Sequence, residues 1–247
     1  MIATPAWPPR STPRLFVPTP LAAGPLTLDG PPAHYLVQVM RAQPGDPVRL
    51  FDDATGEWLA LVVEAAKRRI VLDVRDHLAA RETVPDLWLC FAPLKKAPLD
   101  FLVEKACELG VDRLVPVVTR RTVVDRLNPD RLRANLIEAA EQCGRTALPR
   151  LAEPQKLAPL LAGWPADRAL FFADESGGRP AHAAMAAHAG PAAILIGPEG
   201  GFDPAERAAV RALPGAVGIT LGPRILRAET AAAAALSVWM AAAGDWG

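Results

Sequence analysis

Short apolar segments alternate with turn-forming residues in the first third of the chain. Val and Leu recur at residues 47–51, 57–63 and 69–74, and Asp53-Ala54-Thr55-Gly56 separates the first two segments. Apolar runs of this length between turn signals predict the strands of a small β module. Residues 31–40 fit a short helix that closes this module as a barrel.

The pattern changes after residue 86, where apolar strand segments alternate with amphipathic helical stretches. Asn128-Pro129 and Asp203-Pro204, the latter followed by Glu206, are typical helix starts. The alternation predicts a mostly parallel sheet with helices on its faces, which is an α/β fold. Strands are expected at residues 87–91, 113–118, 169–173, 192–196 and 217–220, and helices at 99–109, 129–143, 181–188 and 228–243.

A charged connection containing Pro85 marks the change of pattern. We therefore expect two domains, residues 1–82 and 83–247, with a loose proline-rich arm before Arg14. No apolar run reaches the roughly 18 residues that span a bilayer, and the N-terminus lacks the apolar core of a secretory signal. Three cysteines without paired spacing indicate a reducing cytoplasm rather than a disulfide framework.

Charge and histidine spacing narrow the candidate functions. The 27 basic residues balance the 27 acidic ones, so a nucleic-acid surface has to be local rather than general. The four histidines are scattered without ligand spacing, so we expect no metal site.

Two strand-to-helix loops carry the candidate chemistry. The first reads Gly197-Pro198-Glu199-Gly200-Gly201, and the second contains Gly222-Pro223-Arg224. Ligands of open α/β sheets bind where such loops leave the strands. The first loop lacks the spacing of dinucleotide and phosphate loops, and Glu199 favours a ligand with hydroxyls, amines or positive charge. Tight turns and helix caps also account for these residues one by one.

In combination these segments resemble a known family. Four sequence motifs are similar to those of the RsmE family. They are residues 196–201, residues 221–231, Glu104-Lys105-Ala106-Cys107-Glu108-Leu109-Gly110-Val111 and Glu141-Gln142-Cys143-Gly144-Arg145. The members of this family are the 16S rRNA uridine-N3 methyltransferases of the SPOUT superfamily. The likeness covers nearly the whole chain from about Arg14.

The resemblance implies a fold and a cofactor. It implies a PUA-like N-terminal β-barrel that binds RNA, a SPOUT methyltransferase domain with a C-terminal trefoil knot, and a homodimer. The cofactor would be S-adenosyl-L-methionine. By similarity, its binding residues are Phe172, Ile196, Gly197, Glu199, Gly200, Leu221, Gly222, Ile225, Leu226 and Thr230.

Uridine N3 must lose a proton before or during methyl transfer, so the reaction needs a base or a cation that stabilises the uracil anion. We assign Arg227 to stabilisation of the uracil anion, and Glu199 or Glu229 to removal of the N3 proton. Glu199 could equally orient cofactor hydroxyls, and Glu229 could cap a helix. The expected partner is 16S rRNA in the small ribosomal subunit, bound through Arg14, Arg41, Arg120, Arg121 and Arg145.

Two alternatives stay open at this point. One is a related SPOUT methyltransferase that acts on tRNA or on a ribose 2′-hydroxyl, although the N-terminal module and the word at residues 141–145 speak against it. The other is a non-catalytic RNA-binding assembly factor with the same fold, although both glycine loops are intact.

Overall fold

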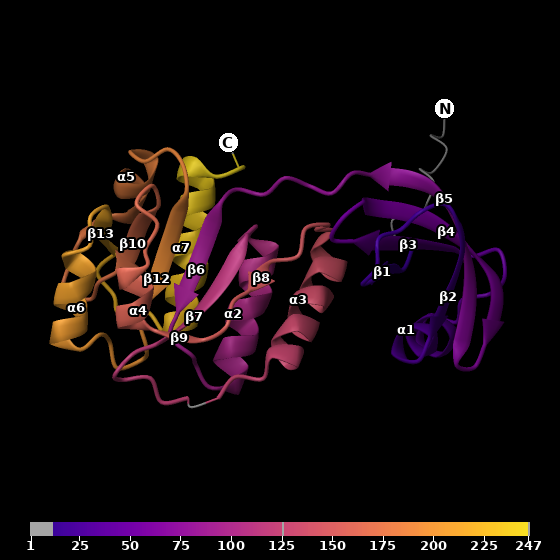
Figure 1. Cartoon of the computed structure of the whole chain (residues 1–247), viewed down its shortest axis with the longest axis horizontal. Coiled ribbons are helices and arrows are strands. Elements are labelled where there is room, and N and C mark those ends of the chain that lie inside the picture. Colours follow the sequence, from indigo (N-terminus) through magenta and orange to yellow (C-terminus); the bar gives the residue numbers. More distant parts are fainter. Residues whose placement is uncertain (1–11, 125, 247) are drawn as a thin grey trace. The chain divides into compact units, whose positions relative to one another are not determined.

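A computed structural model describes residues 12–124 and 126–246 of the 247-residue chain. The expected N-terminal arm lies mostly outside these residues. Two compact units divide the chain (Figure 1): one contains residues up to Thr83 together with Ala140–Ala147, and the other contains Val84–Ala139 and Leu148–Gly247.

The N-terminal unit is built on one mixed sheet with the strand order β1-β3-β4-β5-β2. Only β1 and β3 pair in parallel, and the other neighbours are antiparallel. Alternating buried residues such as Leu50, Val62 and Leu72 form its core. The strands are β1 (Arg14–Phe16), β2 (Gly24–Asp29), β3 (Pro47–Asp52), β4 (Gly56–Ala66) and β5 (Arg69–Ala79).

The expected helix at residues 31–40 is present, but its geometry changes along its length. An α-helical turn, α1 (Pro31–His34), continues as a π-helical segment, η1 (Tyr35–Val39). Leu36 is fully buried against the sheet, which fixes the segment in place. Arg41 follows with a φ of 57°, and it is the only described residue other than glycine in this left-handed region.

Arg14 is buried inside the N-terminal unit. Its guanidinium group donates to Glu57 Oε2 at 2.6 Å and to the carbonyl oxygens of Ala140 and Arg145 at 2.6 and 2.9 Å. It also lies over the ring of Phe51, 3.7 Å from the ring centroid. These partners of Arg14 all belong to its own unit, and two of them tie residues 140–147 to that unit.

The C-terminal unit contains a parallel sheet with the strand order β11-β13-β10-β12-β6-β7-β8, and β9 pairs with β7 at its far end. The long strands β10 and β12 are buried along almost all of their length, as in sheets covered on both faces. The strands are β6 (Leu87–Phe91), β7 (Arg113–Val118), β8 (Arg150–Leu151), β9 (Gln155–Lys156), β10 (Ala169–Ala173), β11 (Arg179–Pro180), β12 (Ala192–Ile196) and β13 (Ala216–Thr220).

Helices cover both faces of this sheet (Figure 1). One layer contains α7 (Ala228–Ala243) packed against α2 (Lys96–Glu108) and α5 (Ala181–Ala186). On the other face, α4 (Leu157–Ala162) packs against α6 (Pro204–Arg211), over a core that includes Leu170 and Phe172. The remaining helix is α3 (Pro129–Cys143). The expected α/β architecture is confirmed.

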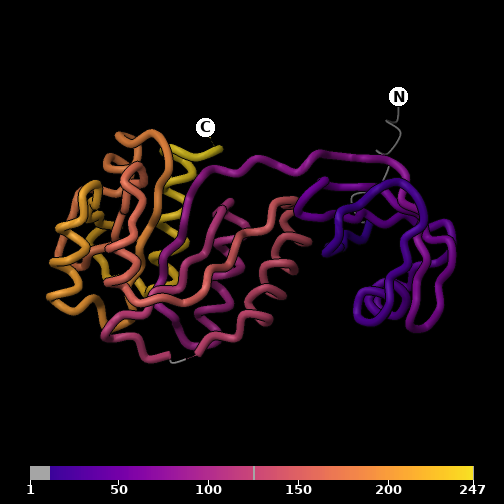
Figure 2. The backbone as a smooth tube through the Cα atoms, in the orientation of Figure 1, coloured from indigo at the N-terminus to yellow at the C-terminus, as the bar shows by residue number. Residues whose placement is uncertain are grey.

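The backbone trace in Figure 2 follows the C-terminal segments from β12 through α6 and β13 to α7. The trefoil knot implied by the resemblance stays a prediction. Within the described residues, no helix combines the length and the apolar character needed to cross a membrane.

Candidate active site

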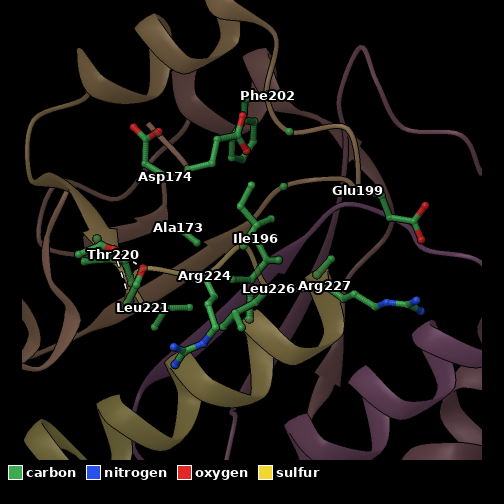
Figure 3. A pocket seen from close by; sticks show the side chains of 18 of the residues that line it. Ala173, Asp174, Ile196, Glu199, Phe202, Thr220, Leu221, Arg224, Leu226 and Arg227 are labelled. Carbon is green, nitrogen blue, oxygen red and sulfur yellow. Dashed lines mark hydrogen bonds between the residues drawn. The ribbon is translucent and has the colours of Figure 1, made fainter. Parts of the chain in front are cut away.

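A cavity of about 600 Å³ opens at the carboxyl ends of three neighbouring strands, β10, β12 and β13. Its walls begin where these strands end, at Ala173, Ile196 and Thr220. The loops after β12 and β13 and the first turn of α7 complete the walls (Figure 3). This is where open parallel sheets bind ligands, and the volume suits a small organic molecule.

Two glycines of the loop after β12 are required by their neighbours. A Cβ atom on Gly197 would lie 2.9 Å from the ring of Phe202, which is buried beneath the loop. A Cβ atom on Gly201, whose φ is +68°, would lie 2.3 Å from Glu175 Oε1. The backbone at Gly197 and Gly201 thus comes closer to these two side chains than a residue with a Cβ atom would permit.

The loop after β10 brings two carboxylates to the cavity, Asp174 and Glu175. Asp174 is buried and accepts hydrogen bonds from Ser176 Oγ at 2.7 Å and from Arg211 Nη2 at 2.6 Å. Burial raises the pKa of Asp174, but the bonds from Ser176 and Arg211 outweigh it, so the pKa falls below its usual 3.8. Arg207 donates to Glu175 Oε1 at 2.5 Å. Helix α6 therefore fixes this loop through its arginines.

Cationic side chains occupy the opposite part of the cavity lining. Arg224 and Arg227 both line it and are exposed. Within the described chain, neither guanidinium group makes a hydrogen bond or an ion pair with another residue. Glu199 also lines the cavity, and in Figure 3 its carboxylate extends toward the same side of the view as Arg227. The cavity thus contains both a carboxylate and guanidinium groups that are available to a ligand.

The segment after β7 supports the glycine loop from outside the cavity. Arg121 Nη1 donates to the carbonyl oxygen of Gly200 at 2.7 Å. The backbone N–H of Arg120 donates to Glu206 Oε1 at 2.9 Å. Glu206 and Asp203 form the capping box at the start of α6. The glycine loop is therefore held at its outer side and at its exit into the helix.

Comparison with protein families accounts for both units. Residues 81–240 match the model of an RNA methyltransferase domain, and residues 28–75 match an RNA methyltransferase PUA domain. The chain is 30% identical over 239 residues to the ribosomal RNA small subunit methyltransferase E of Mycobacterium bovis, covering 88% of this chain and 89% of that protein. The chain belongs to the ribosomal RNA small subunit methyltransferase E family. The family resemblance expected from the sequence is confirmed.

Solved structures related to this family share the fold. A ribosomal RNA small subunit methyltransferase E from Neisseria gonorrhoeae, bound to S-adenosyl methionine, superposes with a TM-score of 0.86 at 25% identity over 96% of this chain and 100% of that one. A methyltransferase from Legionella pneumophila with bound SAM gives a TM-score of 0.84 at 28% identity over 95% and 99%. The expected SPOUT-type α/β domain with a PUA-like N-terminal domain is confirmed.

The structure places most of the family's expected cofactor residues around the cavity. Those that line it are Ile196, Gly197, Glu199, Leu221, Gly222, Ile225 and Leu226. Phe172, Gly200 and Thr230 are not in the lining. Phe172 is 1% exposed and packs in the core, and the next residue, Ala173, lines the cavity instead.

The expected catalytic and RNA-binding residues are dispersed. Arg227 and Glu199 line the cavity, whereas Glu229 lies in the first turn of α7 outside the lining. The remaining expected residues divide by exposure. Arg41, Arg120 and Arg121 are exposed, whereas Arg14 and Arg145 are 7% and 5% exposed, so their guanidinium groups are turned into the protein.

Several lining residues were missed by the sequence interpretation, in particular Asp174, Glu175 and Phe202. Asp174 and Glu175 directly follow the strand at residues 169–173. The rule that selected the loops after the next two strands, namely that ligands bind where parallel strands end, would have found them. Phe202 gave no such signal, because its role depends on the turn that folds it beneath Gly197.

Proposed function

We propose that this chain transfers a methyl group from S-adenosylmethionine to N3 of a uridine in 16S rRNA of the small ribosomal subunit. Membership of the family and the cavity at the ends of β10, β12 and β13 support the proposal. The single observation that carries it is that Glu199 and Arg227 line the same cavity, and that the Arg227 guanidinium group has no hydrogen bond or ion pair within the described residues.

The residues of the cavity fit this cofactor. S-adenosylmethionine supplies an electrophilic methyl carbon on a positively charged sulfur. The carboxylate of Glu199 suits its positive charge and its hydroxyl groups, and Ile196 and Leu226 provide apolar contact for the adenine. Gly197, Gly201 and Gly222 in the two loops let the backbone come close to a ligand. The chain's main contribution is therefore to hold the reacting groups in line.

Arg227 and Glu199 would then serve the nucleophile. Uracil N3 carries a weakly acidic proton, and its loss leaves a negative charge on the base. An exposed guanidinium group without an internal partner can stabilise that charge by hydrogen bonding. Glu199 is the better placed of the two carboxylates proposed as base, because it lines the cavity and Glu229 does not.

We propose RNA contacts on each unit by itself, through Arg41 on the N-terminal unit and through Arg120 and Arg121 on the C-terminal unit. All three are exposed, which phosphate contacts require. Arg14 and Arg145 are left out of these contacts, because their side chains are buried. Local contacts of this kind can bind RNA although the net charge of the chain is zero.

The proposed assembly is a homodimer in the cytoplasm. Ile225 in the loop after β13 is 92% exposed and lines the cavity. A second copy of the chain would cover it. The cytoplasmic location follows from the proposed substrate.

The proposal is tested with methyl-labelled S-adenosylmethionine and small ribosomal subunits from cells that lack this enzyme. After the reaction, the rRNA is digested and its nucleosides are separated. We expect the label in 3-methyluridine. Label in a 2′-O-methylated nucleoside, or transfer to tRNA in a parallel reaction, would support a related methyltransferase instead. Failure to bind the cofactor at all would support a non-catalytic RNA-binding protein.

A further inference from the structure

The segment between β7 and α3 presents an exposed surface beside the glycine loop. A turn in which Thr119 N–H donates to Thr122 Oγ1 at 2.9 Å holds the segment in shape. Arg120 and Arg121 are exposed on it, and Val123 is 68% exposed. Cationic and apolar side chains are both suited to RNA, which offers phosphates and base faces.

Arg121 connects this surface to the loop that lines the cavity. One of its terminal nitrogens, Nη1, donates to the Gly200 carbonyl oxygen at 2.7 Å. A Cβ atom built on Gly200 would lie 3.7 Å from Arg121 Cδ, so the aliphatic stem lies over this residue. No other hydrogen bond or ion pair of this guanidinium group is found within the described residues. Its remaining donors are therefore available to a phosphate.

We propose that Arg121 is a positioning residue that couples RNA binding to cofactor binding. A phosphate bound to the free donors would fix the rotamer of Arg121, and its bond to Gly200 would then cost less conformational entropy. Gly197, Glu199 and Gly201, which line the cavity on either side of Gly200, would be held in place more firmly. RNA and cofactor then strengthen each other's binding by the same factor.

Arg120 provides a matched control in the neighbouring position. Its side chain is 70% exposed, and among the described residues its guanidinium group bonds only to Asp203 Oδ1, at 3.5 Å. The bond from this position to the start of α6 comes from the backbone N–H, which a substitution retains. Replacing Arg120 therefore removes a surface charge but leaves the glycine loop's support in place.

This inference rests on the proposed function and is tested by equilibrium dialysis. The probe is labelled S-adenosylhomocysteine, which has no methyl group to transfer, measured with and without undermethylated small subunits. For the unchanged protein we expect about fivefold tighter binding when subunits are present, in line with a coupling of ordinary size. Arg121→Met keeps the aliphatic stem but loses the donors. We expect it to bind the probe about fivefold more weakly alone and to lose the gain from subunits.

Two further variants separate coupling from a merely structural effect. Arg121→Lys keeps one cationic donor and should recover part of the affinity and part of the gain. Arg120→Met should bind the probe as the unchanged protein does, keep the gain at saturating subunit concentration, and bind subunits more weakly. If Arg121→Met loses affinity but keeps the gain from subunits, or binds as the unchanged protein does, the coupling role is wrong. The proposed function fails separately, if the unchanged protein transfers no methyl group.

Discussion

The carboxylate of Glu175 lies against Gly201, so closely that a Cβ atom at Gly201 would come within 2.3 Å of Glu175 Oε1. Arg207 holds this carboxylate in place from α6 with a bond of 2.5 Å. The loops after β10 and β12 are therefore fitted to each other across the cavity that they both line. Substitutions at this contact should change ligand binding before they change the fold.

Gly201→Ala should weaken S-adenosylmethionine binding about tenfold. The added methyl group would displace Glu175, and a φ of +68° strains any residue with a side chain. Calorimetric titration measures the affinity. Gly200→Ala is the control, because its Cβ atom would meet Arg121 Cδ and Cβ at the ordinary distances of 3.7 and 3.8 Å. Equal losses in the two variants would contradict this account of the glycine loop.

Arg227→Ala should lower kcat about a hundredfold and leave cofactor affinity within about twofold. The reason is that Arg227 is assigned to the charge that develops on the uracil, and removal of one such donor typically costs this much. Single-turnover methylation at saturating cofactor measures the effect, and Arg227→Lys should recover part of it. A full rate with normal cofactor binding would show that Arg227 has no catalytic role.

Asp174 should make the folded protein sensitive to acid. Its pKa is lowered in the folded state, so its charge adds stability at neutral pH, and that stability is lost as the pH falls from about 4 through the lowered pKa. Asp174→Asn should be less stable at pH 7 and should show a shallower decline between about pH 5 and 2. Urea unfolding at a series of pH values measures both quantities. A decline identical to that of the unchanged protein would contradict the assignment.

The sequence was most informative where local patterns decide the outcome. The strands at residues 87–91, 113–118, 169–173 and 192–196 coincide with β6, β7, β10 and β12, because apolar runs and capped helix starts are local signals. The helix at residues 129–143 likewise coincides with α3. The two-residue strands β8 and β9 and the short helix α4 carried too little periodicity to be found.

Long-range contacts account for what the sequence could not show. Arg14 was expected on an RNA surface, but it is buried by partners up to 131 positions away in the chain. No pattern near residue 14 contains that information. Glu175 likewise acquires its place through Arg207, 32 positions further on. The positions of Glu199 and Arg227 in the cavity lining were accessible, because both lie in loops that directly follow strands.

Arg14→Met should lower the free energy of unfolding by about 3 kcal/mol, because it leaves Oε2 of buried Glu57 and two carbonyl groups without the donor that Arg14 supplies, and Glu57 keeps only its bond from Arg49. Urea unfolding measures this loss.

Arg41→Asn should leave stability nearly unchanged, since asparagine tolerates the left-handed conformation of residue 41. It should instead weaken RNA binding. The slope of the logarithm of the affinity against the logarithm of the salt concentration should become shallower by about one. If Arg14→Met instead weakened RNA binding without changing the free energy of unfolding, Arg14 would contact RNA directly.

Reverse transcription of 16S rRNA from cells tests the central claim most directly. A methyl group on N3 occupies the base-pairing edge of uridine and stops the reverse transcriptase. We expect cells without this gene to lose one stop in 16S rRNA, and the unchanged gene to restore it, whereas the Arg227→Ala variant should restore it poorly. An identical pattern of stops with and without the gene would contradict the proposed uridine-N3 methylation.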